Sequence, residues 1–343
     1  MATDTKTKKP KRSRKDFITD TEVRWCPGCG DYAILNSLQR TFAELDTPQE
    51  NFVVISGIGC SSRFPYYMET YGFHSIHGRA PAIATGAKVA NPDLSVWVIT
   101  GDGDGLSIGG NHLLHLLRRN VNINVLLFNN RIYGLTKGQY SPTSPVGTRT
   151  KTTPMGSIDS PIDPVLFALG AKASFIARTV DNNPKHMVEV FKAAEAHKGV
   201  SFIEIMQNCV IFNNGTWDTI NGREHRHDHL LFLKKDQPLL FGKNNEKGIV
   251  LHGVYPRVVP VGDGGVPTED VMVHRPDHVS PLFVRMLAVM GLPDLPVPIG
   301  ILRERPRPTY ENEVLAQIED ARKAKGSGSM HELLHGGSTW TVE

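Results

Sequence analysis

Asp102 and Asn130 carry side-chain oxygens, and each follows a short apolar run. Asp102 lies in the glycine-rich stretch GDGDG of residues 101–105, and Asn130 is the second residue of an Asn pair. Such oxygens suit Mg²⁺, which takes one or two protein carboxylates and completes its coordination with phosphate and water. Glycines let the backbone approach a phosphate group closely, and a helix start offers free N–H groups. The two residues are therefore candidates for holding a metal-bridged diphosphate.

Two predicted strands place these side chains together. Residues 96–99 (VWVI) and 125–128 (VLLF) have the composition of buried strands, and leucines at helical spacing lie between them. Parallel strands joined by a crossover helix end at the same edge of a sheet. Asp102 and Asn130 are thus expected side by side at the carboxyl edge, where open α/β sheets bind ligands. A lone Gly-Asp-Gly would indicate only a turn, and the Asn pair after the next strand favours a site.

Four cysteines form a second set of candidate ligands. Cys26 and Cys29 make a C-P-G-C unit, a spacing that favours metal or redox chemistry over structural disulfides in a cytosolic chain. Cys60 and Cys209 each follow a predicted strand, so we expect them at the same carboxyl edge. Four thiolates fit either Zn²⁺ or an iron–sulfur cluster. The alternative is that Cys60 and Cys209 are small buried hydrophobic residues.

Length and charge set the protein class. The 343 residues suffice for a large core, and a net charge of +3 does not indicate nucleic-acid binding. No apolar run approaches the ~20 residues that span a bilayer, and the start lacks a secretory signal, so we expect a cytoplasmic protein without membrane contact. Residues 1–17 are predicted to be a disordered basic tail, which could steer an acidic redox partner.

Alternating strand and helix patterns predict an α/β fold with a doubly wound, mostly parallel sheet. After the two central strands, residues 163–169 and 185–196 read as helices, and residues 173–178 and 202–206 read as strands. We expect residues 18–217 to form the cofactor-binding domain. Residues 218–343 are expected to be a C-terminal extension, an arm that wraps the core or a partner.

The longest distinctive motif is NNRIYGLTKGQ at residues 129–139. Together with GDG and with WCPGCG at residues 25–30, it closely resembles the β subunits of 2-oxoacid:ferredoxin oxidoreductases, in particular the 2-oxoglutarate type. The resemblance covers roughly residues 25–217. It implies a sheet of the type that binds the diphosphate of thiamine diphosphate (TPP), with Mg²⁺ and a [4Fe–4S] cluster as further cofactors.

The resemblance also implies roles for individual residues. Asp102, Asn130 and the carbonyl group of Ile132 would bind Mg²⁺, and the four cysteines would hold the cluster. The motif suggests His77, rather than His74, at the TPP site. Lys137 would pair with a carboxylate of a dicarboxylic substrate, because pyruvate-type relatives tend to have glycine there. The residues expected to contact TPP are Ile58, Gly59, Cys60, Ser61, His77, Gly101, Gly103, Asp104, Gly134 and Leu135.

The implied reaction is the conversion of 2-oxoglutarate, CoA and oxidised ferredoxin to succinyl-CoA, CO₂ and reduced ferredoxin. The chain offers the half of a TPP site that holds the diphosphate, but no candidate for the half that holds the aminopyrimidine ring. The resemblance implies that a separate α subunit supplies that half, in an (αβ)₂ heterotetramer. The alternatives are the same enzyme class acting on pyruvate or branched-chain 2-oxoacids, a TPP lyase without a cluster, and a non-catalytic module stapled by zinc.

Overall fold

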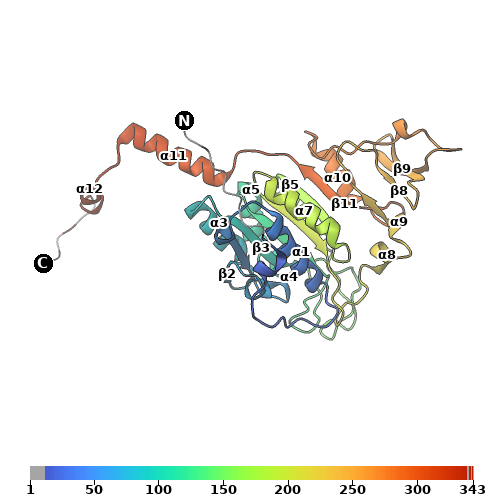
Figure 1. Ribbon diagram of the computed structural model, residues 1–343, viewed down its shortest axis with the longest axis horizontal. Helices are drawn as coiled ribbons and strands as arrows, with labels where there is room; N and C mark the ends of the chain where they lie inside the picture. Colours follow the sequence, from blue (N-terminus) through green and yellow to red (C-terminus); the bar gives the residue numbers. More distant parts are fainter. Residues whose placement is uncertain (1–11, 338–339, 341, 343) are drawn as a thin grey trace.

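An eight-stranded sheet organises the protein, whose computed structural model describes residues 12–337, 340 and 342 (Figure 1). The strand order is β2-β1-β3-β4-β6-β5-β11-β7, and the first six strands in this order are parallel. β11 is antiparallel to β5 and parallel to β7. The predicted mostly parallel α/β sheet is confirmed. The strands are β1 (Phe52–Ser56), β2 (Tyr71–His74), β3 (Ser95–Gly101), β4 (Asn124–Asn129), β5 (Phe175–Val180), β6 (Ser201–Met206), β7 (Leu230–Phe232) and β11 (Val297–Glu304).

The central strands are apolar on both faces, which is why helices cover both sides of the sheet. In β3, Val96 and Val98 belong to one buried cluster, whereas Trp97 and Ile99 belong to the other. The first cluster includes residues of α3, α5, α6 and α10, and the second includes residues of α1 and α7. This two-sided packing is the doubly wound arrangement. The helices are α1 (Asp31–Glu44), α3 (Ala80–Ala90), α5 (Gly110–Arg119), α6 (Pro164–Gly170), α7 (Pro184–Ala196) and α10 (Pro281–Val289).

The C-terminal region contributes to the large sheet, which the sequence did not predict. β7 and β11 extend its edge, and Ile299 and Leu302 of β11 are fully buried. The expected extension from residue 218 is therefore not an arm throughout. A second sheet, in the order β10-β9-β8, follows β7 along the chain. Its strands are β8 (Leu240–Phe241), β9 (Lys247–His252) and β10 (Tyr255–Pro260).

The last two helices are the part that resembles an arm. α11 (Tyr310–Lys325) and α12 (Met330–Leu334) extend away from the sheet (Figure 1). Across the described residues, neither these helices nor any other combines the length and the apolar character needed to cross a membrane.

The ordered structure begins closer to the N-terminus than predicted. Residues Arg14–Phe17 form a short 3₁₀ helix. The Phe17 ring is fully buried, with its centroid 5.7 Å from that of Phe42 and 5.9 Å from that of Phe52. The prediction of disorder is wrong for this stretch, because one aromatic side chain anchors it to the hydrophobic core. Residues 1–11 of the predicted tail lie outside the described residues.

Candidate active site

Asp102 begins a short helix, α4 (Asp102–Leu106), at the carboxyl end of β3. Its side chain is 1% exposed, and its Oδ2 accepts hydrogen bonds from the hydroxyl groups of Ser141 (2.5 Å) and Thr143 (2.6 Å). Burial raises the pKa of Asp102 to about 6, although these two hydroxyl groups act in the opposite direction. A buried carboxyl group whose charge is disfavoured in this way is suited to binding a cation.

Asn130 follows β4, the neighbour of β3. The two strands pair with Gly101 opposite Phe128, so their carboxyl ends lie together. The Oδ1 of Asn130 accepts a hydrogen bond from the backbone N–H of Ile132 (3.2 Å), and its Nδ2 donates one to Gln207 Oε1 (2.8 Å). These two contacts fix the side-chain amide of Asn130 at the turn after β4.

One cavity of about 290 Å³ collects the predicted residues. All the residues expected to contact TPP line it, and so do the three expected to bind Mg²⁺, Asp102, Asn130 and Ile132. The structure therefore brings both groups together at the carboxyl edge. The cavity is also lined by residues that sequence reasoning missed, namely Asp31, Ser107, Ile108, Phe128, Tyr133 and Thr136.

Asp104 lines this cavity, but its carboxylate is committed to the protein. Its Oδ1 accepts hydrogen bonds from the backbone N–H groups of Ile58 (3.1 Å) and Gly78 (2.7 Å), and its Oδ2 accepts one from the Thr100 hydroxyl (2.8 Å). A Cβ atom on Gly57 would lie 1.9 Å from Asp104 Oδ2, so only glycine permits this approach. Asp104 thus fastens two loops to the end of β3.

The four cysteines converge beside the same cavity. A Cβ atom on Gly134 would lie 3.5 Å from Cys209 Sγ and 3.6 Å from Cys60 Sγ, so these two thiols flank one glycine of the cavity wall. Burial raises the pKa of Cys60 to about 12, and the charges of Asp31, Cys209 and Cys26 add to the effect. The pKa of Cys29 is also raised by burial and then by charges that include Cys209 and Cys60.

The thiols are near one another without closing around a single ion. Among residues 12–337, 340 and 342, no group of three or more His, Cys, Asp or Glu side chains is arranged to hold a metal ion. The Cys60 carbonyl accepts a hydrogen bond from Trp25 Nε1 (2.6 Å), and Cys29 Sγ accepts one from Gln207 Nε2 (3.3 Å). Neighbouring polar groups therefore fix parts of the cysteine cluster.

Asp31 is the missed residue with the most unusual environment. It is 2% exposed at the start of α1, and its Oδ1 has no hydrogen-bond partner within the described part of the chain. Burial raises its pKa to about 7. Its position two residues after Cys29 was visible in the sequence, but burial at a cavity wall was not.

The two catalytic candidates take different places. His77 lines the cavity, whereas His74 lines an adjoining pocket that shares Ile58, Gly59 and Leu135 with it. The preference for His77 at the cofactor stays a prediction. Lys137 is exposed, with φ of 75°, on the turn after Gly134, and it does not line the cavity. Its backbone N–H donates to the Gly134 carbonyl (3.0 Å), so it lies just outside the cavity wall.

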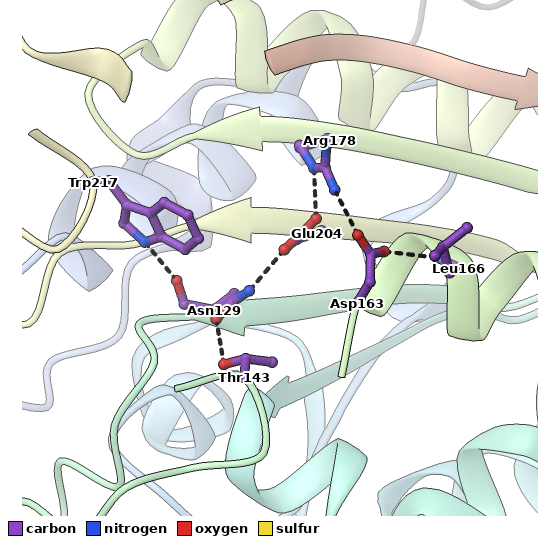
Figure 2. A network of polar contacts seen from close by, with 7 residues as sticks. All are labelled: Asn129, Thr143, Asp163, Leu166, Arg178, Glu204 and Trp217. Atoms are coloured by element: carbon purple, nitrogen blue, oxygen red, sulfur yellow. Dashed lines mark hydrogen bonds and ion pairs between the residues drawn. The ribbon is translucent and has the colours of Figure 1, made fainter. Parts of the chain in front are cut away.

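A chain of polar contacts supports the site from inside the sheet (Figure 2). Thr143, which contacts Asp102, also bonds Asn129 Oδ1 (2.9 Å), and Asn129 Nδ2 donates to Glu204 Oε1 (2.7 Å). Trp217 Nε1 donates to the Asn129 carbonyl (2.9 Å). The strand end that carries the Asn pair is thus held by side chains from three other segments.

The same chain ends in a buried ion pair. Arg178 Nε donates to Glu204 Oε2 at 2.6 Å, and a second nitrogen of Arg178 lies 3.9 Å from Asp163 Oδ2 (Figure 2). Burial alone would lower the pKa of Arg178, but Glu204 and Asp163 outweigh it and raise the pKa. Asp163 also caps α6 by accepting from the Leu166 N–H (2.8 Å). The buried guanidinium is therefore compensated.

Comparison with known proteins agrees with this geometry. Residues 57–205 match the family model of the thiamine pyrophosphate enzyme C-terminal TPP-binding domain. This range begins directly after β1 and contains β2, β3, β4, β5 and all but the last residue of β6, and with them the cavity residues from Ile58 to Thr136. The match supports TPP as the ligand of the cavity.

A relative that matches almost the whole chain decides the family. The chain is 52% identical to the 2-oxoglutarate oxidoreductase subunit KorB of Mycobacterium tuberculosis, over 96% of this chain and 88% of that protein. It belongs to the KorB family of 2-oxoglutarate oxidoreductase β subunits. The 2-oxoglutarate synthase subunit KorB of Methanocaldococcus jannaschii is 40% identical, over 62% of this chain and 77% of that protein.

A solved relative of the KorB family shares the fold. A chain of the 2-oxoglutarate:ferredoxin oxidoreductase from Magnetococcus marinus, solved with 2-oxoglutarate, coenzyme A and succinyl-CoA bound, superposes with a TM-score of 0.73. It is 34% identical, and the match covers 95% of this KorB chain and 96% of that chain. The likeness therefore includes the C-terminal strands that the sequence analysis had set apart.

Proposed function

We propose that this 2-oxoglutarate:ferredoxin oxidoreductase β subunit is the subunit that carries the cofactors, with TPP, Mg²⁺ and a [4Fe–4S] cluster bound by residues 18–217. One observation carries the proposal. Cys60 is one of the four thiols and also lines the cavity, and Gly134 of the cavity wall lies between Cys60 and Cys209. TPP supplies stabilisation of the carbanion left by decarboxylation, and a neighbouring one-electron centre can accept its electrons singly.

The residues present fit these groups. Asp102, Asn130 and the Ile132 carbonyl would bind Mg²⁺, a hard cation that prefers oxygen ligands. The two hydroxyl groups that bond Asp102 Oδ2 would hold this carboxylate in place for the metal. The four cysteines would hold the cluster, whose usual protein ligands are four thiolates. Asp104 would act as a positioning residue, since its carboxylate is used in fastening loops.

The remaining roles depend on a partner. His77, on the cavity wall, would contact the cofactor, and Lys137 would bind the distal carboxylate of 2-oxoglutarate once an α subunit closes the site. We infer an (αβ)₂ heterotetramer in which the α subunit holds the aminopyrimidine ring. Ferredoxin would receive the electrons, and CoA would accept the succinyl group.

The first test uses the complex with its α partner, purified without oxygen. CoA-dependent reduction of ferredoxin or a viologen dye is followed with 2-oxoglutarate, pyruvate and a branched-chain 2-oxoacid in parallel. A clear preference for 2-oxoglutarate supports the proposal. A preference for another 2-oxoacid retains the cofactors and overturns the substrate, and inactivity with TPP and cluster both bound overturns the reaction.

A second test concerns the cluster. Cys26→Ser, Cys60→Ser and Cys209→Ser are each expected to lose iron and acid-labile sulfide. Ser62→Ala is the matched control, because the Ser62 hydroxyl is buried near Cys60 and has no hydrogen-bond partner within the described residues. Zinc without sulfide in the wild-type complex would instead favour a zinc-stapled module.

A further inference from the structure

Beyond β11 the chain runs into a segment with arginine at alternate positions, RERPR at residues 303–307. Alternate residues of an extended chain point to the same side. Accordingly, Arg303, Arg305 and Arg307 line one cavity of about 520 Å³. The other walls come from the turn between α6 and β5 and from the start of α10, namely Leu169, Gly170, Lys172, Ser174, Val279 and Pro281, with Pro306 between the arginines.

These cations lack counter-charges. Within the described residues, none of the three arginines or Lys172 forms an ion pair. Arg303 Nε, one of the terminal nitrogens of Arg303 and Arg307 Nε are buried and have no hydrogen-bond partner in the described part of the chain. Burial lowers the pKa of Arg303, and the charges of Arg305 and Arg307 lower it further. Leaving charged donors buried and unpaired is costly, so the arrangement calls for an anion.

Backbone contacts keep the cations together. One terminal nitrogen of Arg307 donates to the carbonyl groups of Leu117 (3.2 Å) and Lys172 (2.9 Å). The Arg305 backbone N–H donates to the Ser174 carbonyl (2.8 Å), and its side chain donates to the Val279 carbonyl (3.1 Å). Arg305 and Arg307 are therefore held at the cavity despite their mutual repulsion. The positive end of the α10 dipole lies at the same wall.

We propose that this cavity binds a phosphate-bearing small molecule with two or more negative charges. The planar guanidinium group presents paired donors that match phosphate oxygens, and three such groups meet here. The cavity falls within the range of roughly 300–1,000 Å³ that small-molecule sites occupy, which is larger than one phosphate group requires. The apolar wall, formed by Leu169, Val279, Pro281 and Pro306, would receive an organic part of the ligand.

The site is distinct from the cofactor cavity. Glu304 pairs with Phe175, the first residue of β5, so the arginines lie at the amino end of that strand. Asp102 and Asn130 lie beyond the carboxyl ends of strands parallel to β5. A strand of six residues is about 20 Å long, so the two sites occupy opposite edges of the sheet.

The test uses the complex with its α partner, saturated with TPP and Mg²⁺. Inorganic phosphate and ADP serve as probes in equilibrium dialysis and in thermal unfolding, against chloride at equal ionic strength. We expect phosphate and ADP to raise the thermal midpoint and chloride not to. Arg303→Met should weaken binding of both probes roughly tenfold or more, the effect of losing charged hydrogen bonds. It should also raise the midpoint measured without anion, because an unpaired, half-buried charge is removed.

Two further variants sharpen the outcome. Arg303→Lys keeps the charge without the paired donors and should bind phosphate with intermediate affinity. Arg257→Gln, which removes an exposed arginine from β10 in the second sheet, should behave as wild type.

Three results would overturn the proposal. One is a wild-type complex that responds no more to phosphate than to chloride. Another is an Arg303→Met protein whose anion-free midpoint falls, which would indicate a structural role. The third is loss of the α subunit from the Arg303→Met complex without any phosphate binding in the wild type, which would make the cavity a protein interface.

Discussion

The two edges of the large sheet hold charges of opposite sign, which are buried at the carboxyl edge and half-buried at the amino edge. At the carboxyl edge, burial raises the pKa values of Asp31 and Asp102, so their negative charge is disfavoured. At the amino edge, burial lowers the pKa values of Arg303 and Arg307, so their positive charge is disfavoured. A ligand of the opposite charge would stabilise the charged side chains at each edge. The first suits a cation such as Mg²⁺, and the second suits a phosphate-bearing anion.

Between these edges lies a buried charge of a different kind. Arg178 on β5 is paired with Glu204 and lies near Asp163, and its pKa is raised. Arg303 lies on β11, the strand next to β5, and has no such partner among the described residues. Burial of an arginine is therefore not informative by itself. The presence or absence of a carboxylate beside it separates a structural ion pair from a candidate binding site.

Removing the carboxylate partner of Arg178 is expected to have the largest effect on stability. Glu204→Leu should destabilise the complex by about 3–5 kcal/mol, because an uncompensated guanidinium remains buried. The double variant Arg178→Met with Glu204→Leu should recover much of this loss, measured by denaturant unfolding. Equal loss in the single and double variants would show that the pair does not act as a compensated charge.

At the carboxyl edge, substitution can remove the Ser141 and Thr143 hydroxyl groups that bond Asp102. The Ser141→Ala and Thr143→Val double variant should weaken Mg²⁺-dependent TPP retention by roughly tenfold or more, since hydrogen bonds to a charged group are lost. Retention with Ca²⁺ should fall less, because Ca²⁺ accepts bidentate carboxylates. Thr148→Val is the control, as its hydroxyl bonds the Pro145 carbonyl in the same segment. An equal loss with both metals would contradict the orienting role.

Substitution of Lys137 tests whether residues at the carboxyl edge also determine which substrate is used. Lys137→Gly should raise the KM for 2-oxoglutarate by roughly tenfold, with a much smaller change for pyruvate, because only the larger substrate carries a second carboxylate. Lys151→Gly, an exposed lysine of the same segment, serves as the control. Steady-state kinetics of the complex provide the measurement. A similar rise for both substrates would count against the assignment.

The smallest expected effect concerns His197 at the amino edge, which should make stability depend on pH. This buried residue bonds the Ser174 hydroxyl (2.7 Å), and burial lowers its pKa from 6.5 to about 4. Between these values the unfolded chain binds a proton that the folded chain does not, so stability is lost as the pH falls from 6.5 towards 4. His197→Gln should flatten this part of the thermal-midpoint profile. The exposed His252→Gln should leave it unchanged, and an unchanged slope in His197→Gln would contradict the assignment.

Local sequence determined much of the cofactor edge. The GDG turn, the Asn pair and the cysteines after β1 and β6 were predictable, because a parallel strand delivers the residue after it to a known edge of the sheet. Aromatic and β-branched runs identified those strands without knowledge of their neighbours. Residues 299–308 were harder to interpret, because arginine and proline follow the apolar residues and a register shift between Ile301 and Arg303 interrupts the period of the strand.

Only the tertiary structure decided which polar groups have partners. Ser141 and Thr143 reach Asp102 across about forty residues of chain, and no local pattern marks such a contact. The arginine cavity likewise joins segments near residues 172, 280 and 305. Residue type and spacing can place a charge on an edge of the sheet. Whether that charge is buried, and whether a counter-charge lies beside it, depends on packing between segments far apart in the sequence.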